Sequence, residues 1–563
     1  MCIRDSTQSD RRIARVVFLG AAAGALLLGV EWLWGRMLWL DEEMIAINLR
    51  DRSMRELAGT LSLGQAAPYG WLVLQRTMLL AGGTGERTLR LIPLVFGMAT
   101  LATASWIGRR WMTAAGALSL VFLCTMGQWV SFHALELKHY SADACFGLLL
   151  PALAAWAVGK DAEGVNRRRR VLAWWIVAAT AQWISNGALF VTPACAIVLV
   201  LFTARRFGWQ EGMRAAMPGC LWLASFAVNY RVTLGPALGN TFLKGYWANA
   251  FPPAAAGPVE ILRWLASQLT PLAVKPGGSG FGAAFWGVSA VGLLAAPGYP
   301  LAFRVLFASV PCSAFAWAGL RLVPVSDRLG LWFVPALYVG LAMSVETSIA
   351  LLRPGITPRL RWIRTAAGAG SLIVLLAMAA DTYARGKIYL AMRPYASNHD
   401  LNDRGAINWL LRQRRDGDVW LASYLSLPAI WWYAGREAST PAVEASLEPG
   451  SSNCGGSDVG AWAKAGGARR VLVYLGFGHD TPPEFDERLL DRLSSVGSVT
   501  AYRPFHAGHA LIVDFTEPSA RPVTLASLAP QPSGSGQAPA FSPDRPAAKP
   551  GPGCITVAPA RRW

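Results

Sequence analysis

Charged side chains are scarce in this chain, since Asp, Glu, Lys and Arg together make up 15% of its 563 residues. Hydrophobic residues make up 53%, and the mean hydropathy is +0.33. A water-soluble globular domain carries roughly 25% charged residues, so this composition excludes a purely cytosolic enzyme. It indicates an integral membrane protein.

Motifs for metal frameworks and for nucleotide binding are also lacking. There is no Cys-x-x-Cys pair, and five of the eight cysteines lie inside apolar runs, which is typical of neither a zinc framework nor a disulfide scaffold. The glycine-rich stretch 277–282 lacks the Lys-Ser/Thr ending of a Walker loop. Nucleotide-driven chemistry is therefore unsupported.

Eleven apolar runs predict a polytopic, mainly α-helical membrane protein. The first run follows the basic residues Arg11, Arg12 and Arg15, is long enough to cross about 30 Å of hydrocarbon, and lacks a small-residue cleavage site. It is therefore expected to remain as an uncleaved span, while residues 1–6 carry no structural signal and need not be native. The runs lie at 16–34, 91–108, 113–131, 141–158, 171–185, 187–203, 215–230, 281–296, 301–320, 329–352 and 365–383.

The apolar segment 68–81 has only 14 residues, about 21 Å of helix, and is too short to span the bilayer. If it does not cross, one side of the membrane receives 19 Lys and Arg in short loops that include Arg167 to Arg170, and the other receives 14 in loops twice as long. The positive-inside rule then places residues 1–15 in the cytoplasm. The long loop 35–90 lies outside, with two helices resting at the membrane interface.

The same rule explains the net charge of +18, which could otherwise suggest nucleic acid. We expect the lipid bilayer as a partner and no nucleic acid. After the eleven spans of the membrane domain, 16–383, the chain continues on the outer side.

Residues 384–516 have mixed patterns that predict a small α/β domain outside the membrane. Its expected helices lie at 402–415 and 483–496, and its expected strands at 418–423, 469–476, 498–504 and 509–515. Residues 517–563 contain ten prolines and are predicted to be disordered.

Two polar clusters lie on the predicted outer side. Asp41, Glu42 and Glu43 follow the first span directly, and Glu136, Lys138, His139 and Tyr140 stand between two later spans. Ionisable residues gathered at a membrane boundary are candidates for function. Two simpler interpretations stay open: the acidic cluster is a solvated helix start, and Lys138 reaches toward the interface to pair with Glu136.

The order of several motifs resembles the GT-C glycosyltransferases. Those motifs are LWLDEE at 38–43, GQAAPYGWL at 64–72, GERTLRLIPLVFG at 85–97, GRRW at 108–111 and ELKHYSAD at 136–143. The resemblance is to the bacterial family 39 type, which is related to protein O-mannosyltransferases and lipid A aminoarabinose transferases. It covers roughly 16–160 and continues loosely through SDRLGLWFVP at 326–335.

The resemblance implies an enzyme that takes a sugar from a polyprenyl-phosphate carrier. It implies that Asp41 either is the catalytic base or orients the acceptor, with Glu42 beside it. It also implies that Glu136 helps to build the same site, in some members by holding a divalent metal, and that Arg328 faces the donor phosphate. Lys138 stands where many members have Arg. Gln65, His139 and Tyr140 are candidates for the substrate pocket. Gln65 begins a segment that replaces the commoner His-Pro-Pro.

The chemistry agrees with these residue types. Displacement at an anomeric carbon needs a carboxylate to take the acceptor proton, a role for Asp41. The phosphate that leaves needs cations, with Arg328 binding its oxygens bidentately and Lys138 acting as a point charge. A divalent metal, Mg²⁺ or Mn²⁺, stays open, and the missing histidine of the His-Pro-Pro segment speaks against it.

The sequence therefore predicts a glycosyltransferase of the bacterial inner membrane, with a cytoplasmic N-terminus and a periplasmic C-terminal domain. Its partners would be a polyprenyl-phosphate sugar and a lipid, glycan or protein acceptor. The alternatives are a non-enzymatic transporter or flippase of lipid-linked sugars, which would place its polar groups near the bilayer midplane, and a membrane-anchored scaffold.

Overall fold

The computed structural model describes residues 8–296, 298–352, 361–390, 402–435, 442–445, 457–458, 462, 469–476, 489–491, 493–505, 508–516 and 555–558. The chain divides into two compact units. Met1–Gly35 and Leu49–Met392 form the membrane unit, and Arg36–Asn48 and Arg393–Trp563 form the C-terminal unit. The start of the loop predicted at 35–90 thus groups with the C-terminal residues and not with the spans.

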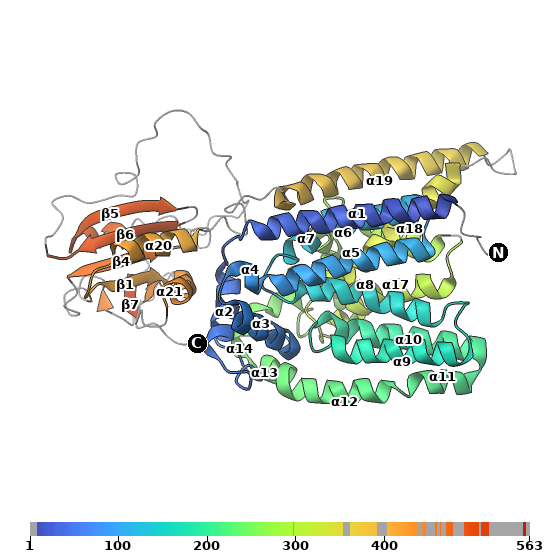
Figure 1. Cartoon of the computed structure of the whole chain (residues 1–563), viewed down its shortest axis with the longest axis horizontal. Helices are drawn as coiled ribbons and strands as arrows, with labels where there is room; N and C mark the ends of the chain where they lie inside the picture. Colours follow the sequence, from blue (N-terminus) through green and yellow to red (C-terminus); the bar gives the residue numbers. More distant parts are fainter. Residues whose placement is uncertain are drawn as a thin grey trace. The chain divides into compact units, whose positions relative to one another are not determined.

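The membrane unit is a bundle of apolar helices. In the described residues, seven are long and apolar enough to cross a membrane, which makes this a multi-pass membrane protein. Figure 1 shows α1, α5 and α8 running roughly alongside one another. The seven are α1 (Gln8–Leu33), α5 (Leu91–Trp111), α8 (Tyr140–Ala157), α10 (Gly187–Phe207), α17 (Leu301–Gly319), α18 (Val334–Leu352) with the turn before it, and α19 (Arg361–Leu390).

The other four predicted spans also coincide with helices. Two of them, α6 (Ala114–Met126) and α16 (Ala283–Ala295), are apolar but have only 13 residues each. The remaining two are α9 (Gly164–Ala181), which begins among four arginines, and α12 (Gly219–Asn229). That these four shorter or more polar helices also cross the membrane stays a prediction.

The loops predicted outside contain further helices. Residues 35–90 hold α2 (Leu40–Asp51), α3 (Tyr69–Gly82) and the single turn α4 (Glu86–Leu89), so the two expected helices are present. After α11 (Trp209–Ala216) and α12, the segment 230–280 is largely helical. It holds η1 (Tyr230–Leu234), α13 (Gly235–Gly239), α14 (Thr241–Tyr246), η2 (Ala248–Ala250) and α15 (Pro258–Val274).

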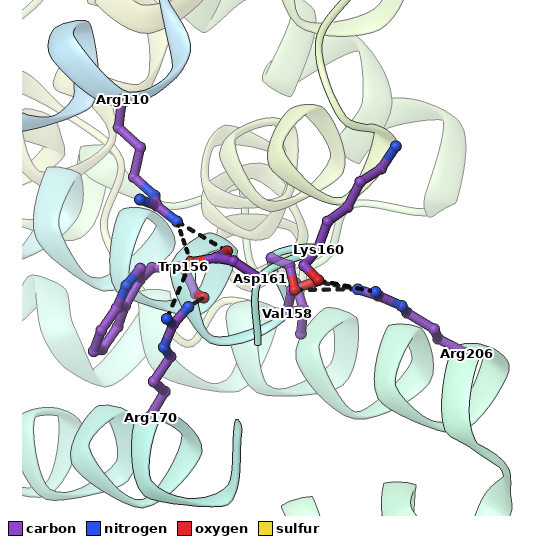
Figure 2. A network of polar contacts seen from close by, with 8 residues as sticks. Arg110, Trp156, Val158, Lys160, Asp161, Arg170 and Arg206 are labelled. Atoms are coloured by element: carbon purple, nitrogen blue, oxygen red, sulfur yellow. Dashed lines mark hydrogen bonds and ion pairs between the residues drawn. The ribbon is translucent and has the colours of Figure 1, made fainter. Parts of the chain in front are cut away.

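Arginines tie three of the basic loops together at one end of the membrane unit (Figure 2). Asp161 accepts from Arg110, at 2.9 and 3.0 Å, and from Arg170, at 3.0 Å. Arg206 donates to the carbonyl groups of Val158, Gly159 and Lys160. Loops that the charge bias assigns to one side of the membrane therefore meet.

The C-terminal unit contains a seven-stranded mixed sheet in the order β3-β7-β2-β1-β4-β6-β5. Strand β1 is parallel to β2 and β4, while β6 is antiparallel to β4 and β5. The strands are β1 (Val419–Ser423), β2 (Ala442–Ala445), β3 (Ser457–Asp458), β4 (Arg470–Leu475), β5 (Ser498–Phe505), β6 (Gly508–Asp514) and β7 (Ile555–Ala558).

Alternating side chains of the central strands build a core on each face of this sheet. Trp420, Leu472 and Ile512 pack with α20 (Asp403–Gln413) and α21 (Leu427–Tyr433), whereas Leu421 and Val473 face the opposite side with leucines of 489–493. The period of two arises because successive strand residues point to opposite faces.

The predicted elements of this domain are confirmed for the helix at 402–415 and for the four strands. Most of the predicted helix 483–496 lies outside the described residues, as do residues 1–6. The prediction of disorder for 517–563 also lies largely outside them, but Ile555–Ala558, with three β-branched residues, pairs with β2 as strand β7. Helix α21 and strands β2 and β3 were not predicted.

Candidate active site

Four candidate residues lie in the short connection after α7 (Gln128–His133) and at the first residue of α8. Glu136, Lys138, His139 and Tyr140 are all buried, with exposed fractions of 0 to 5%. The connection turns tightly, because the N–H of Lys138 donates to the carbonyl of Glu136 at 2.7 Å. Polar side chains buried in such a turn need polar partners, and the structure supplies them.

Glu136 lies among basic groups. Its carboxylate contacts Nδ1 of His133, and Arg328 and Lys138 are close enough to act on it electrostatically. Burial alone would raise the pKa of Glu136, but His133, Arg328 and Lys138 together lower it well below its usual value. Glu136 is therefore ionised across the physiological pH range.

Lys138 is tied to a loop far away in the sequence. Its ammonium donates to Oε1 of Gln65 at 2.6 Å. Gln65 is itself buried and its amide donates to the carbonyl of Leu63. The simple interpretation of Lys138 as a residue reaching for the interface is wrong, because the ammonium group is buried within the bundle's polar end.

Arg328 lies in the 3₁₀ segment η3 (Asp327–Phe333), which leads directly into α18. The guanidinium is 5.8 Å from the ring of Tyr140 and 5.9 Å from that of Trp247. Asp327, at a positive φ of 49°, forms an ion pair of 2.9 Å with Lys275. Aromatic rings and this turn together hold the guanidinium in place.

His139 is neutral. Burial lowers its pKa to about 3, and the positive charge of Lys138 adds to this. Its Nε2 lies 3.1 Å from Nδ2 of Asn186 and 3.6 Å from Oδ2 of Asp143. Asp143 in turn accepts from the hydroxyl of Ser185 at 2.6 Å, so these groups form one buried polar network.

Close packing fixes η3 against α8 and α10. A methyl group on Gly147 would lie 1.8 Å from the carbonyl oxygen of Trp332, and one on Gly187 would lie 2.3 Å from Cβ of the same residue. The segment that carries Arg328 therefore approaches α8 more closely than a Cβ atom permits. Gly147 is a structural requirement of the site.

Each of the five outer loops predicted between the spans of the membrane domain contributes to this end of the membrane unit. Gln65 comes from the loop after α1, Glu136 to Tyr140 from that before α8, and Asn186 from the turn before α10. Trp247 and Arg328 come from the last two outer segments. Six nominated residues are thus brought together: Gln65, Glu136, Lys138, His139, Tyr140 and Arg328.

Asp41 and Glu42 fall in the C-terminal unit, within the first turn of α2. Glu42 accepts a hydrogen bond from the N–H of Trp39 at 3.3 Å, which caps the helix. Glu42 therefore lies at a helix start, but it is not solvated as the simpler interpretation expects, because the residue is 0% exposed. The association of Asp41 and Glu42 with Glu136 stays a prediction.

The residues around Glu136 do not fit a divalent metal. In the described part of the chain, no group of three or more His, Cys, Asp or Glu side chains is placed to hold a metal ion. Glu136 already faces Lys138 and Arg328, whose positive charges oppose the binding of a further cation.

Several residues of the site were not nominated from the sequence. His133, Asp143, Asn186 and Lys275 are polar, and Trp247 is an aromatic residue of a long loop. His133 and Asp143 lie within a few residues of Glu136 in the sequence, so their position beside that polar cluster could have identified them as candidates. Asn186 and Lys275 had none, because only folding brings their loops to this end.

The fold of the chain is of the GT-C type. ArnT from Cupriavidus metallidurans bound to undecaprenyl phosphate aligns with 90% of this chain and 99% of that one, at 13% identity and a TM-score of 0.55. Its apo state aligns with 88% and 97%, at 12% identity and a TM-score of 0.52.

The apo form of the Archaeoglobus fulgidus oligosaccharyltransferase aligns with 85% of this chain and 71% of that one, at 11% identity and a TM-score of 0.47. No family model and no curated protein matches the sequence. The likeness to the two ArnT structures shows the fold of the chain, and it confirms the predicted GT-C type of fold.

Proposed function

We propose that the protein is a glycosyltransferase that moves a sugar from a polyprenyl-phosphate carrier to an acceptor at the periplasmic face of the bacterial inner membrane. The observation that carries the proposal is the group of two cations, Lys138 and Arg328, around ionised Glu136 in a chain of GT-C fold. The breaking glycosidic bond leaves negative charge on a phosphate, and cations in a buried site stabilise that charge.

The roles follow from the chemistry of each group. The acceptor oxygen attacks the anomeric carbon, Asp41 takes the acceptor proton, and the bond to the phosphate oxygen breaks, which releases a polyprenyl phosphate. Arg328 and Lys138 bind the phosphate oxygens, while Glu136 keeps both cations in place before the donor binds. The helix that begins at η3 adds its positive end to the same charge.

Asp41 carries the role of base because a carboxylate must take the acceptor proton and Glu136, held ionised by its cations, is a poor proton acceptor. Glu42 is engaged in capping α2 and is proposed to fix the direction of Asp41. Gln65, His139 and Tyr140 are proposed to line the pocket and to position Lys138 and Arg328.

A transport assay separates this proposal from a flippase. The purified protein is reconstituted in vesicles containing a radiolabelled polyprenyl-phosphate sugar and a set of lipid, glycan and peptide acceptors. Transfer moves the label from the polyprenyl lipid to an acceptor. If the label changes leaflet and stays on the polyprenyl lipid, the protein is a transporter and the proposal fails.

Parallel reactions with a chelator test the metal. We expect transfer to continue in EDTA, because Lys138 and Arg328 already supply the positive charge that a divalent ion would bring. A loss of transfer that Mg²⁺ or Mn²⁺ restores would contradict this expectation.

A further inference from the structure

The residues that follow α1 are built into the C-terminal unit. The N–H of Leu38 donates to the hydroxyl of Tyr433 at 3.1 Å. Trp39 and Leu40 are buried, and Met44 and Leu425 pack against them. The beginning of α2 is therefore held by the C-terminal domain through its main chain and through apolar side chains.

A pair of buried acidic side chains joins the same two segments. The carboxyl groups of Glu43 and Asp403 are hydrogen-bonded to each other, and the Tyr474 hydroxyl donates to Oδ1 of Asp403. The exposed fractions of Glu43, Asp403 and Tyr474 are 1, 4 and 1%. Two carboxylates cannot both be ionised at such a contact in an apolar environment, so the pair retains one proton.

Glu43 is the member that holds the proton. Burial, followed by the negative charge of Asp403, raises the pKa of Glu43 well above its usual value. Asp403 accepts from Tyr474 as well as from Glu43, and both hydrogen bonds favour its ionised form. The protonated Glu43 therefore donates to the Asp403 carboxylate, a charge-assisted hydrogen bond.

Asp403 and Tyr474 both belong to regular elements of the C-terminal unit. Asp403 is the first residue of α20, whose cap Asn402 accepts from the N–H of Gly405 at 3.1 Å. Tyr474 lies in β4, which is paired on both edges with β1 and β6. The contact thus connects α2 to the middle of the sheet.

The geometry of α2 links the position of Glu43 to the direction in which the Asp41 side chain points. Two positions apart on an α-helix correspond to about 200° of rotation, so Asp41 and Glu43 lie on opposite faces of α2. Asp41 is partly exposed whereas Glu43 is 1% exposed. Fixing the face of Glu43 fixes the rotation of the helix and hence the direction of Asp41.

We propose that the C-terminal domain positions Asp41, and that Asp403 and Tyr474 do so by holding Glu43 in a proton-sharing contact. The domain is then a part of the catalytic apparatus and not only a surface that selects acceptors. Glu43, Asp403 and Tyr474 are positioning residues, and the inference rests on the proposed function because it concerns the base of that reaction.

The test compares Glu43→Ala with Glu43→Gln in the full-length protein. The amide of Gln donates to Asp403 as the protonated acid does, whereas Ala removes the donor. Hydrogen–deuterium exchange of residues 36–48 is expected to rise at least tenfold in Glu43→Ala and to stay within twofold of wild type in Glu43→Gln. Tyr474→Phe, which removes the hydroxyl that supports Asp403, is expected to give an intermediate rise.

Transfer kinetics give a second readout. We expect Glu43→Ala to lower kcat by about 10- to 100-fold with the donor KM within twofold, because a displaced base slows the chemical step and leaves binding intact. Glu43→Gln should retain kcat. Asp416→Ala, which removes an exposed acidic side chain of the same domain, is the matched control and should match wild type in both measurements.

The pH profile separates a shared proton from simple packing. Among the described residues, the carboxylates whose charges act on Glu43 are Asp403 and Glu42. The ionisable hydroxyl group of Tyr474 interacts with both Asp403 and Glu43, and that of Tyr433 lies beside it. Since the pKa of Glu43 is raised, the contact is intact at low pH and is lost as the pH rises through that pKa. Glu43→Gln cannot lose this proton, so its activity should extend further into the alkaline range.

Unchanged exchange of residues 36–48 in both Glu43→Ala and Tyr474→Phe would overturn the inference. So would a Glu43→Gln variant as impaired as Glu43→Ala. If wild type transfers no sugar at all, the proposed function fails, and the exchange measurement still decides whether the C-terminal domain holds α2.

Discussion

Lys138 and Arg328 approach Glu136 from different elements and offer different chemistry to a phosphate. Arg328 presents a planar group between two aromatic rings, suited to bidentate contact, whereas Lys138 presents a point charge fixed by Gln65. Neither can move far without breaking a contact that the structure shows. The two cations are thus ordered before a donor arrives, which reduces the entropy lost on binding.

Replacing Arg328 with Gln should weaken donor binding. Hydrogen bonds to a charged group contribute about 1.5 to 3 kcal/mol, so the donor KM should rise by roughly 10- to 100-fold. The measurement is the initial rate of transfer against donor concentration. The matched control is Arg263→Gln, an exposed arginine of α15, which should leave KM unchanged. If Arg328→Gln and Arg263→Gln raised the donor KM equally, the effect would come from the net charge of the protein and not from a contact of Arg328 with the donor.

His139 should make the protein less stable in acid. The unfolded chain takes up a proton near pH 6.5, but burial keeps the folded residue neutral down to a pKa of about 3. Stability therefore falls as the pH drops below 6.5, by about 1.4 kcal/mol for each pH unit. Between pH 7.5 and 5, His139→Asn should lose about 2 kcal/mol less than wild type in thermal unfolding. An equal loss in both proteins would contradict this.

The sequence predicted the members of the site better than their partners. Glu136, Lys138 and Arg328 were recognisable because ionisable residues beside apolar runs are rare. Asn186 and Lys275 could not be predicted, since each lies in a loop whose position depends on how the helices pack. The hydrogen bond between Lys138 and Gln65 joins residues 73 positions apart and has no local signal.

Packing between elements supports the site through α8. Trp332 of η3 lies against Gly147 of α8 and Gly187 of α10, so the segment with Arg328 depends on two residues that have no side chain. Helix α8 begins with Tyr140, whose ring faces Arg328. A change in the distance between α8 and η3 should therefore displace the guanidinium group of Arg328.

Gly147→Ala tests this dependence. The added Cβ atom would meet the carbonyl oxygen of Trp332, so η3 must shift. We expect a loss of stability of about 1 to 3 kcal/mol, measured by thermal unfolding in detergent, together with a raised donor KM. Gly287→Ala in α16 is the control, because nothing lies within 4 Å of its added Cβ atom. A Gly147→Ala protein that behaves like this control would refute the account.

Elements with a strong local pattern were predicted correctly, and those without one were not. The eleven apolar runs coincide with helices, and the alternating runs of the C-terminal domain coincide with β1, β4, β5 and β6. Helix α21 is too short and aromatic for a clear period, and β2 and β7 have four residues each. Such short elements form because tertiary pairing stabilises them.

At the scale of the whole molecule, charge sorts the loops of the membrane unit. The arginine network around Asp161 joins three basic loops at one end, as the positive-inside rule requires. The residues around Glu136 come from the loops assigned to the other side. Which end faces the cytoplasm is a prediction of the charge bias.

Labelling of introduced cysteines tests that orientation. A membrane-impermeant maleimide should label Arg55→Cys and Asp416→Cys in spheroplasts with an intact inner membrane, and Arg169→Cys only after that membrane is permeabilised. These three side chains are exposed, so reagent access depends on the side of the membrane. Labelling of Arg169→Cys in intact spheroplasts would reverse the predicted topology.

The most direct test of the proposed chemistry is the rate at which wild type and Asp41→Asn release polyprenyl phosphate from a lipid-linked sugar at saturating donor and acceptor. The amide keeps the size of the side chain and removes its ability to take a proton. We predict a loss of at least about 10²-fold in kcat with the donor KM little changed. Full activity of Asp41→Asn would contradict the account.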